Sequence, residues 1–279
     1  MFNLGTKSRP ILKWAGGKTG LLPQLTKHFP NHFQRYIEPF FGGGAVFFSL
    51  KNGVPAVLND VNKELFNLYS VVRDSPQELM RALDVLTEKY SEEFYYELRT
   101  QSPPSFVDMA ARTVFLNKTG FNGLYRQNSK GGFNVPYGKR TKCPALYETE
   151  NLMTVCEKLR NAEIRNQDFE SVINDAGAGD FVYCDPPYEP LSATSSFNAY
   201  TGGGFSQADQ RRLRDACASA AHRGAVVAVS NSSAPFVKSI YEDWDIRTVL
   251  AKRAINSNAS SRGEIEEVLV LLQQSVSLV

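Results

Sequence analysis

The sequence predicts an α/β fold, in which a mostly parallel sheet is covered by helices on both faces and carries a mostly helical insertion. Short apolar runs alternate with helical patterns before residue 75 and again after residue 165. Between these two parts, the recognisable patterns are helical. A chain of 279 residues can bury one full α/β core and still carry such an insertion. We therefore expect a sheet domain at 1–74 and 166–279, and an insertion at 75–165.

The N-terminal part contains two expected strand–helix units. A β-like run, Arg35–Phe41, breaks into Gly42-Gly43-Gly44, and the apolar segment Ala45–Leu50 then begins like a helix. The next short apolar run, 56–58, ends in Asn59-Asp60 and is followed by a second helical pattern. Each unit therefore brings a distinctive turn to the end of a strand.

The insertion is expected to be helical in its first half. Ser75 is a candidate N-cap, Pro76 suits the first helical position, and Glu78 would complete a capping box. A second helix is expected over Phe106–Asn117. The stretch 118–145, rich in glycine and basic residues, predicts a loop or short hairpin.

After residue 165 the strand–helix alternation resumes. The apolar run Phe181–Cys184 must leave the sheet at Asp185-Pro186-Pro187-Tyr188, because two prolines cannot continue a central strand. A helix over Ser206–His222, with Ser206 as N-cap, should lead into a buried strand at Ala225–Val229. Two further strand candidates follow: Arg247–Leu250 and Glu267–Leu272.

Composition narrows the class only slightly. The formal net charge of +2 does not distinguish a nucleic-acid-binding protein from an ordinary enzyme. The four cysteines show no CxxC spacing, which argues against a disulfide scaffold and against a structural zinc site, and we expect no metal. No stretch approaches the roughly 20 apolar residues of a membrane span, so we expect a cytoplasmic protein that does not contact membranes.

Distinctive residues follow three expected strand ends: the glycine turn at 42–44, Asn59-Asp60 and the tetrapeptide 185–188. Ligands of open α/β sheets bind outside the carboxyl ends of the strands, so these residues outline one pocket. The first two have simpler explanations as well. The glycines could form only a tight turn, and Asp60 could be the N-cap of a helix that begins near Asn62. Likewise, Lys13 and Lys18 could belong to a solvated turn.

The tetrapeptide Asp185-Pro186-Pro187-Tyr188 points to chemistry on a planar amine. The prolines fix the backbone, so the aspartate carboxylate and a proline carbonyl can act as adjacent hydrogen-bond acceptors beside a tyrosine face. The lone pair of an aromatic amine such as adenine N6 is delocalised into the ring. Two acceptors that hold its two N–H groups favour a more tetrahedral nitrogen, whose lone pair can attack an activated methyl group.

Six segments together resemble the Dam/DpnM family of adenine-N6 DNA methyltransferases: KWAGGK at 13–18, EPFFGGG at 38–44, Asn59-Asp60, TGFNGLYRQN at 119–128, FNVPYGK at 133–139 and DPPYEPLSAT at 185–194. Their order is that of the α group. The resemblance implies a Rossmann-like S-adenosylmethionine-dependent methyltransferase sheet with a target-recognition insertion. It also implies methylation of adenine in double-stranded DNA, within GATC, after the base is flipped out of the helix.

The resemblance also assigns roles to individual positions. It implies that Asp185, Pro186, Pro187 and Tyr188 form the catalytic motif, in which the carboxylate orients the amine and the tyrosine stacks on the base. Residues implied to bind the cofactor are Trp14, Lys18, Phe40, Gly42, Gly44, Asp60, Asp168, Phe169 and Asp185. Residues implied to bind DNA are Lys13, Phe121, Asn122, Leu124, Arg126, Pro136 and Lys139.

The segment 118–142 independently suggests contact with DNA. It contains six basic residues and no acidic one, an imbalance that a phosphate backbone attracts. Aromatic residues are interleaved with the charges, at Phe121, Tyr125, Phe133 and Tyr137; such side chains can stack where a base has been removed. A solvated basic loop is the plainer alternative. The serine- and glycine-rich loop 189–205 could order over a flipped base or be a simple connection.

Other functions stay open at this point. The same acceptor geometry would serve cytosine N4 or an RNA base, and a catalytically silent DNA-binding module could retain the fold. The chemistry itself is common to restriction–modification, DNA replication and repair marking, and phage self-protection. Nothing in the sequence indicates an oligomeric state.

Overall fold

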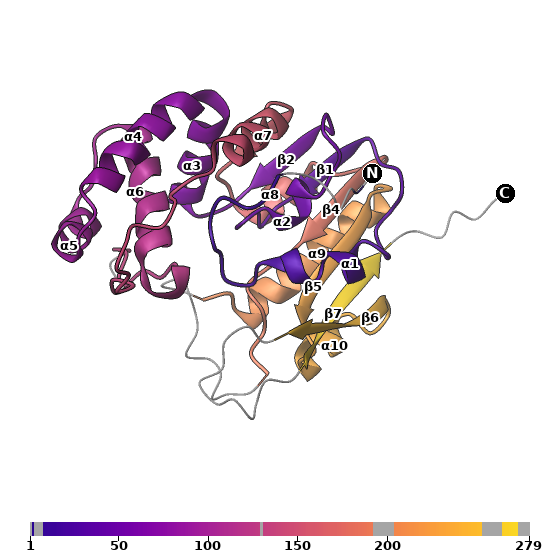
Figure 1. Ribbon diagram of the computed structural model, residues 1–279. Coiled ribbons are helices and arrows are strands. Elements are labelled where there is room, and N and C mark those ends of the chain that lie inside the picture. Colours follow the sequence, from indigo (N-terminus) through magenta and orange to yellow (C-terminus); the bar gives the residue numbers. More distant parts are fainter. Residues whose placement is uncertain (1, 3–7, 129–130, 192–203, 253–263, 273–279) are drawn as a thin grey trace.

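The described residues of the computed structural model, 2, 8–128, 131–191, 204–252 and 264–272, contain a seven-stranded sheet with helices on both faces (Figure 1). The strand order is β3-β2-β1-β4-β5-β7-β6. The strands are β1 (Arg35–Glu38), β2 (Ala56–Asn59), β3 (Ala162–Arg165), β4 (Asp180–Cys184), β5 (Val226–Ser232), β6 (Asp245–Lys252) and β7 (Glu264–Leu272).

The sheet has one point at which its strand order reverses. Strand β1 pairs in parallel with β2 on one side and with β4 on the other, and β3 and β5 extend the parallel part. Strand β7 lies antiparallel between β5 and β6. The predicted mostly parallel α/β sheet is therefore confirmed, and its ligand-binding position is the carboxyl edge of β1 and β4.

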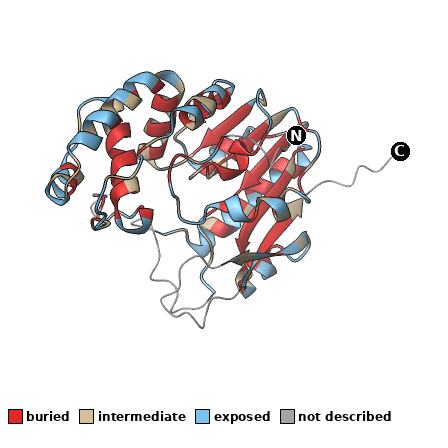
Figure 2. Ribbon diagram, in the orientation of Figure 1, coloured by how far each residue is buried: buried red, intermediate tan, exposed pale blue. Residues whose placement is uncertain are grey.

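Alternation along the strands divides the core into two apolar layers. In β4, Phe181 and Tyr183 belong to one apolar cluster, whereas Val182 and Cys184 belong to the other. Successive residues of a strand point to opposite faces, so each layer needs its own helices. The first cluster includes residues of helices α1 (Leu22–Leu25), α2 (Ala45–Phe48), α3 (Lys63–Asp74) and α7 (Thr149–Leu159). The second includes residues of α8 (Phe169–Asn174), α9 (Gln207–His222) and α10 (Pro235–Ile240). Both faces of the central strands β1, β2, β4 and β5 are buried, and these strands are mostly red in Figure 2.

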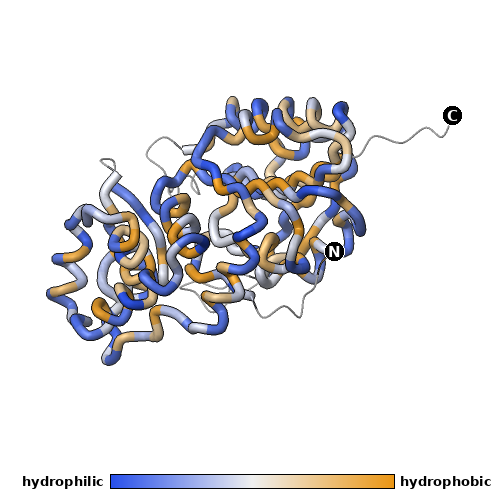
Figure 3. Tube along the Cα trace, turned by 90° about the horizontal axis from the view of Figure 1, so that it is seen from above, coloured by the Kyte–Doolittle hydropathy of each residue, from blue (hydrophilic) through white to orange (hydrophobic). Residues whose placement is uncertain are grey.

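The first cluster continues beyond the sheet into the helices of the insertion, which form a separate group beside it (Figure 1). In Figure 3, hydrophobic residues concentrate where helices meet the sheet and one another. The helices are η1 (Lys18–Gly20), α1 (Leu22–Leu25), α2 (Ala45–Phe48), α3 (Lys63–Asp74), α4 (Pro76–Glu88), α5 (Glu92–Thr100), α6 (Phe106–Thr119), η2 (Phe121–Gly123), α7 (Thr149–Leu159), α8 (Phe169–Asn174), α9 (Gln207–His222) and α10 (Pro235–Ile240).

Two details of the expected insertion differ from the structure. Residues 162–165, expected in the insertion, form strand β3 and pair with β2, so they belong to the sheet. Ser75 does occupy the N-cap position of α4, but its side chain makes no capping hydrogen bond, so the expected capping box is wrong. Helices α5 and α7 lie in stretches for which the sequence suggested no element.

Other local expectations are met. Ser206 caps α9 in a full capping box with Asp209. The stretch after α6 is mostly irregular, with isolated antiparallel bridges that join Gln127 to Phe133 and Gly120 to Tyr137. Most of the loop 189–205 lies outside the described residues, so neither expectation for it is tested.

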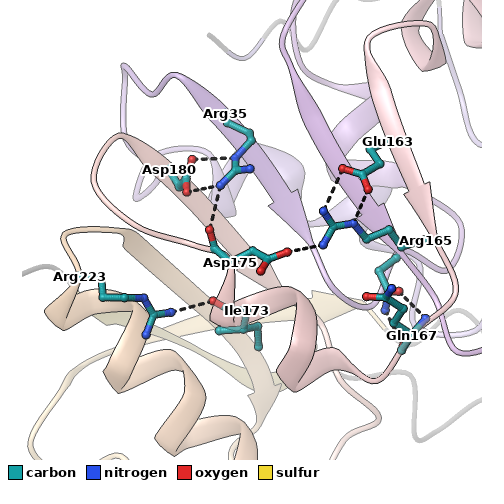
Figure 4. A network of polar contacts seen from close by, with 9 residues as sticks. Arg35, Glu163, Arg165, Gln167, Ile173, Asp175, Asp180 and Arg223 are labelled. Carbon is teal, nitrogen blue, oxygen red and sulfur yellow. Dashed lines mark hydrogen bonds and ion pairs between the residues drawn. The ribbon is translucent and has the colours of Figure 1, made fainter.

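A polar network joins the amino ends of β1 and β4 to β3 (Figure 4). The Arg35 guanidinium at the start of β1 binds the Asp180 carboxylate at the start of β4, with N–O distances of 3.0 and 2.8 Å. Arg35 also donates to the carbonyl of Asp175. The Asp175 carboxylate pairs with Arg165 at the end of β3, and Arg165 binds Glu163. This network lies mostly at the edge opposite to the carboxyl ends of β1 and β4.

Candidate cofactor and catalytic site

The glycine turn after β1 can only be built with glycine at two positions. Gly42 and Gly44 have φ angles of +49° and +70°, which favour glycine. A Cβ atom on Gly42 would lie 2.9 Å from Cδ1 of Trp14, and one on Gly44 would lie 2.5 Å from Cζ of Phe41. The turn therefore brings bare backbone to the carboxyl edge of β1, with Trp14 packed over it.

Asp60, at the end of β2, holds this turn. Its Oδ2 accepts a hydrogen bond from the Gly42 amide at 2.8 Å, and its Oδ1 accepts one from the Asn62 amide at 2.9 Å. The N-cap of α3 is Asn62 itself, so the alternative that Asp60 caps that helix is wrong. Burial raises the pKa of Asp60 to about 6, and the two amide hydrogen bonds oppose the rise.

Asp185 follows β4 and lies against Lys18. The Lys18 ammonium is 2.7 Å from Oδ1 of Asp185, and the two side chains are only 5% and 19% exposed. The ammonium also donates to the carbonyl of Gly16, so the alternative of a solvated lysine turn is wrong for Lys18. Burial raises the pKa of the Asp185 carboxyl, and the Lys18 charge opposes that rise.

The backbone after Asp185 is fixed by polar side chains that the sequence analysis did not identify. Gln210 of α9 donates to the Pro187 carbonyl at 3.0 Å, and Asn231 of β5 accepts from the Glu189 amide at 3.2 Å. Asn231 also donates to Gln210, so the two buried amides form one unit. The Tyr188 hydroxyl donates to Glu267 of β7 at 2.8 Å. No motif marks these partners, because only the sheet order brings them to the loop.

Aromatic rings adjoin the glycine turn on the side of α8. The rings of Phe40 and Phe169 stack with centroids 5.3 Å apart, and Phe205, which the sequence analysis did not identify, contacts both. Asp168 caps α8 through Oδ1, and the same oxygen pairs with Arg212 at 2.7 Å. The predicted residues Phe40, Asp168 and Phe169 thus lie in one region, with the Asp168 carboxylate exposed.

The N-terminal turn and the loop after α6 are locked together by one buried amide. Asn117 of α6 accepts a hydrogen bond from the Lys13 amide at 3.0 Å and donates to the Lys13 carbonyl at 2.9 Å. It also donates to the Gly123 carbonyl at 3.0 Å. The Lys13 side chain itself is exposed. Asn117 therefore places Lys13 beside the loop that contains Phe121 and Arg126.

That loop exposes most of the residues predicted to bind DNA. Phe121 is 49% exposed, and Asn122 is exposed with a φ angle of +56°. The Arg126 guanidinium is exposed and binds the Asn134 side chain at 2.8 Å. The remaining predicted residues are Leu124, which is half-buried, and Pro136 and Lys139, which are exposed.

The other aromatic residues of the loop have a different environment. Tyr125, Phe133 and Tyr137 are buried in the apolar core, so only Phe121 of the four interleaved aromatic residues is exposed. The sequence pattern could not distinguish an exposed aromatic side chain from one that anchors the loop.

The described residues offer no candidate membrane span and no candidate metal site. Among them, no helix is long and apolar enough to cross a membrane. Nor does the described part of the chain contain a group of three or more histidine, cysteine, aspartate or glutamate side chains that could hold a metal ion.

Comparison with known proteins identifies relatives over nearly the whole chain. The family of D12 class N6 adenine-specific DNA methyltransferases matches residues 14–255. The Type II methyltransferase M1.LlaDCHI of Lactococcus lactis subsp. cremoris is 43% identical over 270 residues, which are 94% of each chain. The Type II methyltransferase M.MjaIII of Methanocaldococcus jannaschii is 40% identical, over 94% of this chain and 98% of its own. The DNA adenine methylase of Vibrio cholerae serotype O1 is 34% identical, over 97% and 98%.

These relatives decide among the functions that the sequence left open. They favour adenine in DNA over cytosine N4 and RNA bases, and an enzyme over a silent binding module. The methyl donor is S-adenosylmethionine, and the bare glycine turn held by Asp60 suits a bound nucleoside. From the family match and these relatives, we conclude that this chain belongs to the D12 class of N6 adenine-specific DNA methyltransferases.

Proposed function

We propose that this enzyme methylates adenine N6 within GATC in double-stranded DNA, after rotating the target nucleotide into a pocket formed by Asp185, Pro186 and Tyr188. One observation carries the proposal. The Asp185 carboxylate lies at the carboxyl end of β4, is only 19% exposed, and is paired through Oδ1 with the Lys18 ammonium at 2.7 Å. An ionised carboxylate has about four lone-pair sites, so the pair with Lys18 leaves Asp185 able to accept an amine N–H as well.

The chemistry follows from the positions of these acceptors. Asp185 would accept one N–H of the adenine amine, and the Pro186 carbonyl would accept the other. Gln210 already occupies the carbonyl of Pro187, which orients the neighbouring peptide. Held by two acceptors, the nitrogen directs its lone pair at the methyl group that S-adenosylmethionine supplies. Lys18 would keep Asp185 ionised, as hydrogen-bond acceptance requires.

The cofactor would lie along the carboxyl edge from β2 to β4. We propose that Asp60 binds the ribose hydroxyls and that Gly42 and Gly44 allow close approach of the cofactor to the backbone. Phe40 and Phe169 would contact its adenine, with Asp168 near the amino group. Trp14 and Lys18 would border the methionine end.

Base flipping is required by the reaction. Adenine N6 is engaged in Watson–Crick pairing and cannot meet a methyl donor inside the stack, so extrusion costs a few kcal/mol. Tyr188 would stack on the flipped base. The exposed Phe121 and Asn122 would fill the space that it leaves in the helix.

The proposed GATC specificity is supported by the resemblance of 119–128 and 133–139 to the Dam/DpnM family. The names of the relatives compared above state no recognition sequence. Leu124 and Arg126 would read bases, Lys13 would contact a flanking base, and Pro136 and Lys139 would lie along the DNA. We propose that target recognition belongs to 75–161, since 162–165 are part of the sheet.

The test is the transfer of tritium from methyl-labelled S-adenosylmethionine to synthetic duplexes. One duplex contains a single GATC site, and matched duplexes replace each base pair of that site in turn. We expect label on adenine N6 of the GATC duplex and little on the others. Equal labelling of all adenine-containing duplexes would refute the GATC assignment, and labelling of cytosine would refute the reaction.

A further inference from the structure

Glu267 is a carboxylate at the edge of the proposed catalytic pocket to which the catalytic motif assigns no role. Its Oε2 accepts a hydrogen bond from the Tyr188 hydroxyl at 2.8 Å. The two residues are 79 positions apart in the sequence. The contact joins β7 to the loop after β4, and it reaches the residue proposed above to stack on the flipped base.

The antiparallel direction of β7 explains how Glu267 reaches this place. In the register of β5 and β7, Ser232 at the end of β5 lies opposite Glu267 near the start of β7. The start of β7 therefore lies at the same edge as the carboxyl ends of the parallel strands. The next three residues of β7, 268–270, are fully buried apolar residues, whereas Glu267 is only partly buried.

The Tyr188 ring is held at two points. Glu267 fixes its hydroxyl, and the Lys18 ammonium lies over one face, 4.8 Å from the ring centroid. A cation over a ring is attracted to its face but leaves the ring free to rotate in its own plane and to slide. The hydrogen bond at the hydroxyl removes that freedom. A base would then stack on the face opposite Lys18.

We infer that Glu267 is a positioning residue for methyl transfer, which holds the Tyr188 ring in the orientation that receives the flipped adenine. The inference rests on the proposed stacking role of Tyr188. Glu267 itself acts through the phenol hydroxyl and need not contact the substrate. Misplacing a positioning group by about 1 Å can cost on the order of 100-fold in rate, so its loss should affect turnover more than binding.

A double-mutant cycle tests the inference. The variants are Glu267→Ala, Tyr188→Phe and both together, with Glu267→Gln as a conservative variant that keeps an acceptor oxygen. Glu266→Ala is the matched control, because Glu266 is the exposed neighbour on the same strand. The readouts are kcat, the KM for DNA and for S-adenosylmethionine, and the fluorescence of 2-aminopurine at the target position.

We expect Glu267→Ala and Tyr188→Phe each to lower kcat about tenfold, as for loss of one charge-assisted hydrogen bond. The KM for S-adenosylmethionine should stay unchanged. The double variant should be no worse than either single one, Glu267→Gln should recover most of the activity, and Glu266→Ala should behave as wild type. The altered stacking should also change the 2-aminopurine signal at saturating enzyme. If Glu267→Ala does not fold, Tyr188→Phe removes the same contact from the other side.

Additive losses in the double variant, or wild-type kcat in both single variants, would overturn the inference. Tyr188→Ala separates this failure from failure of the proposed function. If Tyr188→Ala is inactive while Glu267→Ala and Tyr188→Phe turn over normally, stacking stands and only the role of Glu267 is lost. If Tyr188→Ala is fully active, the stacking role and the inference fall together.

Discussion

Asp185 is the residue on which the proposed chemistry depends most directly. Asp185→Ala removes the acceptor that grips the adenine amine, so methyl transfer should fall below detection. Binding of DNA should stay within about twofold of wild type, because the residue acts on the base after extrusion. Tritium transfer and fluorescence anisotropy with a GATC duplex measure the two effects.

The matched control for Asp185→Ala is Asp215→Ala. Asp215 is an exposed carboxylate on α9 that pairs with its neighbour Arg214. A surface pair of this kind contributes little to stability, so this variant should resemble wild type in both assays. Wild-type turnover by Asp185→Ala would remove Asp185 from the mechanism.

The raised pKa of Asp60 leads us to expect that cofactor binding depends on pH. Its pKa is raised to about 6 by burial, so the carboxylate is ionised above pH 6 and increasingly protonated below it. Only the ionised form can accept two hydrogen bonds from a ribose diol with full strength. The Kd for S-adenosylmethionine should therefore rise as the pH falls from 7 to 5, as calorimetry at several pH values would show.

The same titration has an opposite effect on stability. A carboxyl group with a raised folded-state pKa destabilises the native state when ionised, so this contribution improves as the pH falls from about 6 towards 4. Protonation of Asp60 therefore does not unfold the protein, and weaker cofactor binding at pH 5 would not come from unfolding caused by this residue. Asp60→Asn should bind the cofactor weakly at all pH values. A wild-type Kd that is flat between pH 5 and 7 would contradict the role of Asp60.

A buried lysine of α7 binds the backbone at the end of α2. The Lys158 ammonium donates to the carbonyl of Phe48, the last residue of α2, at 2.8 Å, and to the carbonyl of Leu50, just beyond the helix. Lys158→Met would leave these carbonyls without that donor, at a cost of about 1–3 kcal/mol. Denaturant unfolding should show the loss, whereas Lys51→Met, at an exposed neighbouring position, should not.

The pH dependence of this variant provides a second check. Burial lowers the pKa of Lys158 to about 8, so between pH 8 and about 10.5 the unfolded chain binds more protons at this residue than the folded one. Stability from this group therefore rises with pH in that window. The stability difference between wild type and Lys158→Met should be larger at pH 10 than at pH 7. A difference that shrinks would show instead that folding raises the pKa of Lys158, so that its hydrogen bonds stabilise the cation more than burial disfavours it.

The exposed basic residues of the loop after α6 should divide into those that contact bases and those that contact the phosphate backbone. An arginine that is bidentate to guanine discriminates by roughly 1–3 kcal/mol, whereas a lysine on phosphate adds affinity without sequence information. Arg126→Ala should therefore reduce the preference for GATC roughly 10- to 100-fold. Lys139→Ala should weaken binding to all duplexes alike and lower the salt dependence by about one ion.

The measurement for both variants is kcat/KM on GATC and on single-substitution duplexes at two salt concentrations. Asn134→Ala is a useful third variant, because Asn134 holds the Arg126 guanidinium at 2.8 Å. It should resemble a milder Arg126→Ala. Full discrimination by Arg126→Ala, or a changed preferred site in Lys139→Ala, would contradict this division of the loop.

At the scale of the whole molecule, the features that were predicted correctly are those that a short stretch of sequence specifies by itself. The glycine turn, Asp60 and the tetrapeptide from Asp185 each follow a strand, and parallel strands place such ends at one edge. Strand β3 was missed because Ala162–Arg165 is a short edge strand that is only partly buried, without a clear apolar run. Gln210 and Glu267 were missed for another reason. Their neighbours at the site are set by the order of the strands, which no local pattern contains.

Asn117 has a consequence for exchanging specificities between relatives of this enzyme. Because the Asn117 amide binds the backbone of both Lys13 and Gly123, the N-terminal turn and the loop after α6 are held in a fixed relative position. A Cβ atom on Gly123 would lie only 2.8 Å from the Lys13 side chain, so the two segments are also matched in shape. A graft of residues 118–142 alone should therefore give a chimaera that discriminates poorly between target sequences. We expect the donor's target specificity to be transferred in full only when residues 10–14 and Asn117 are grafted together with the loop.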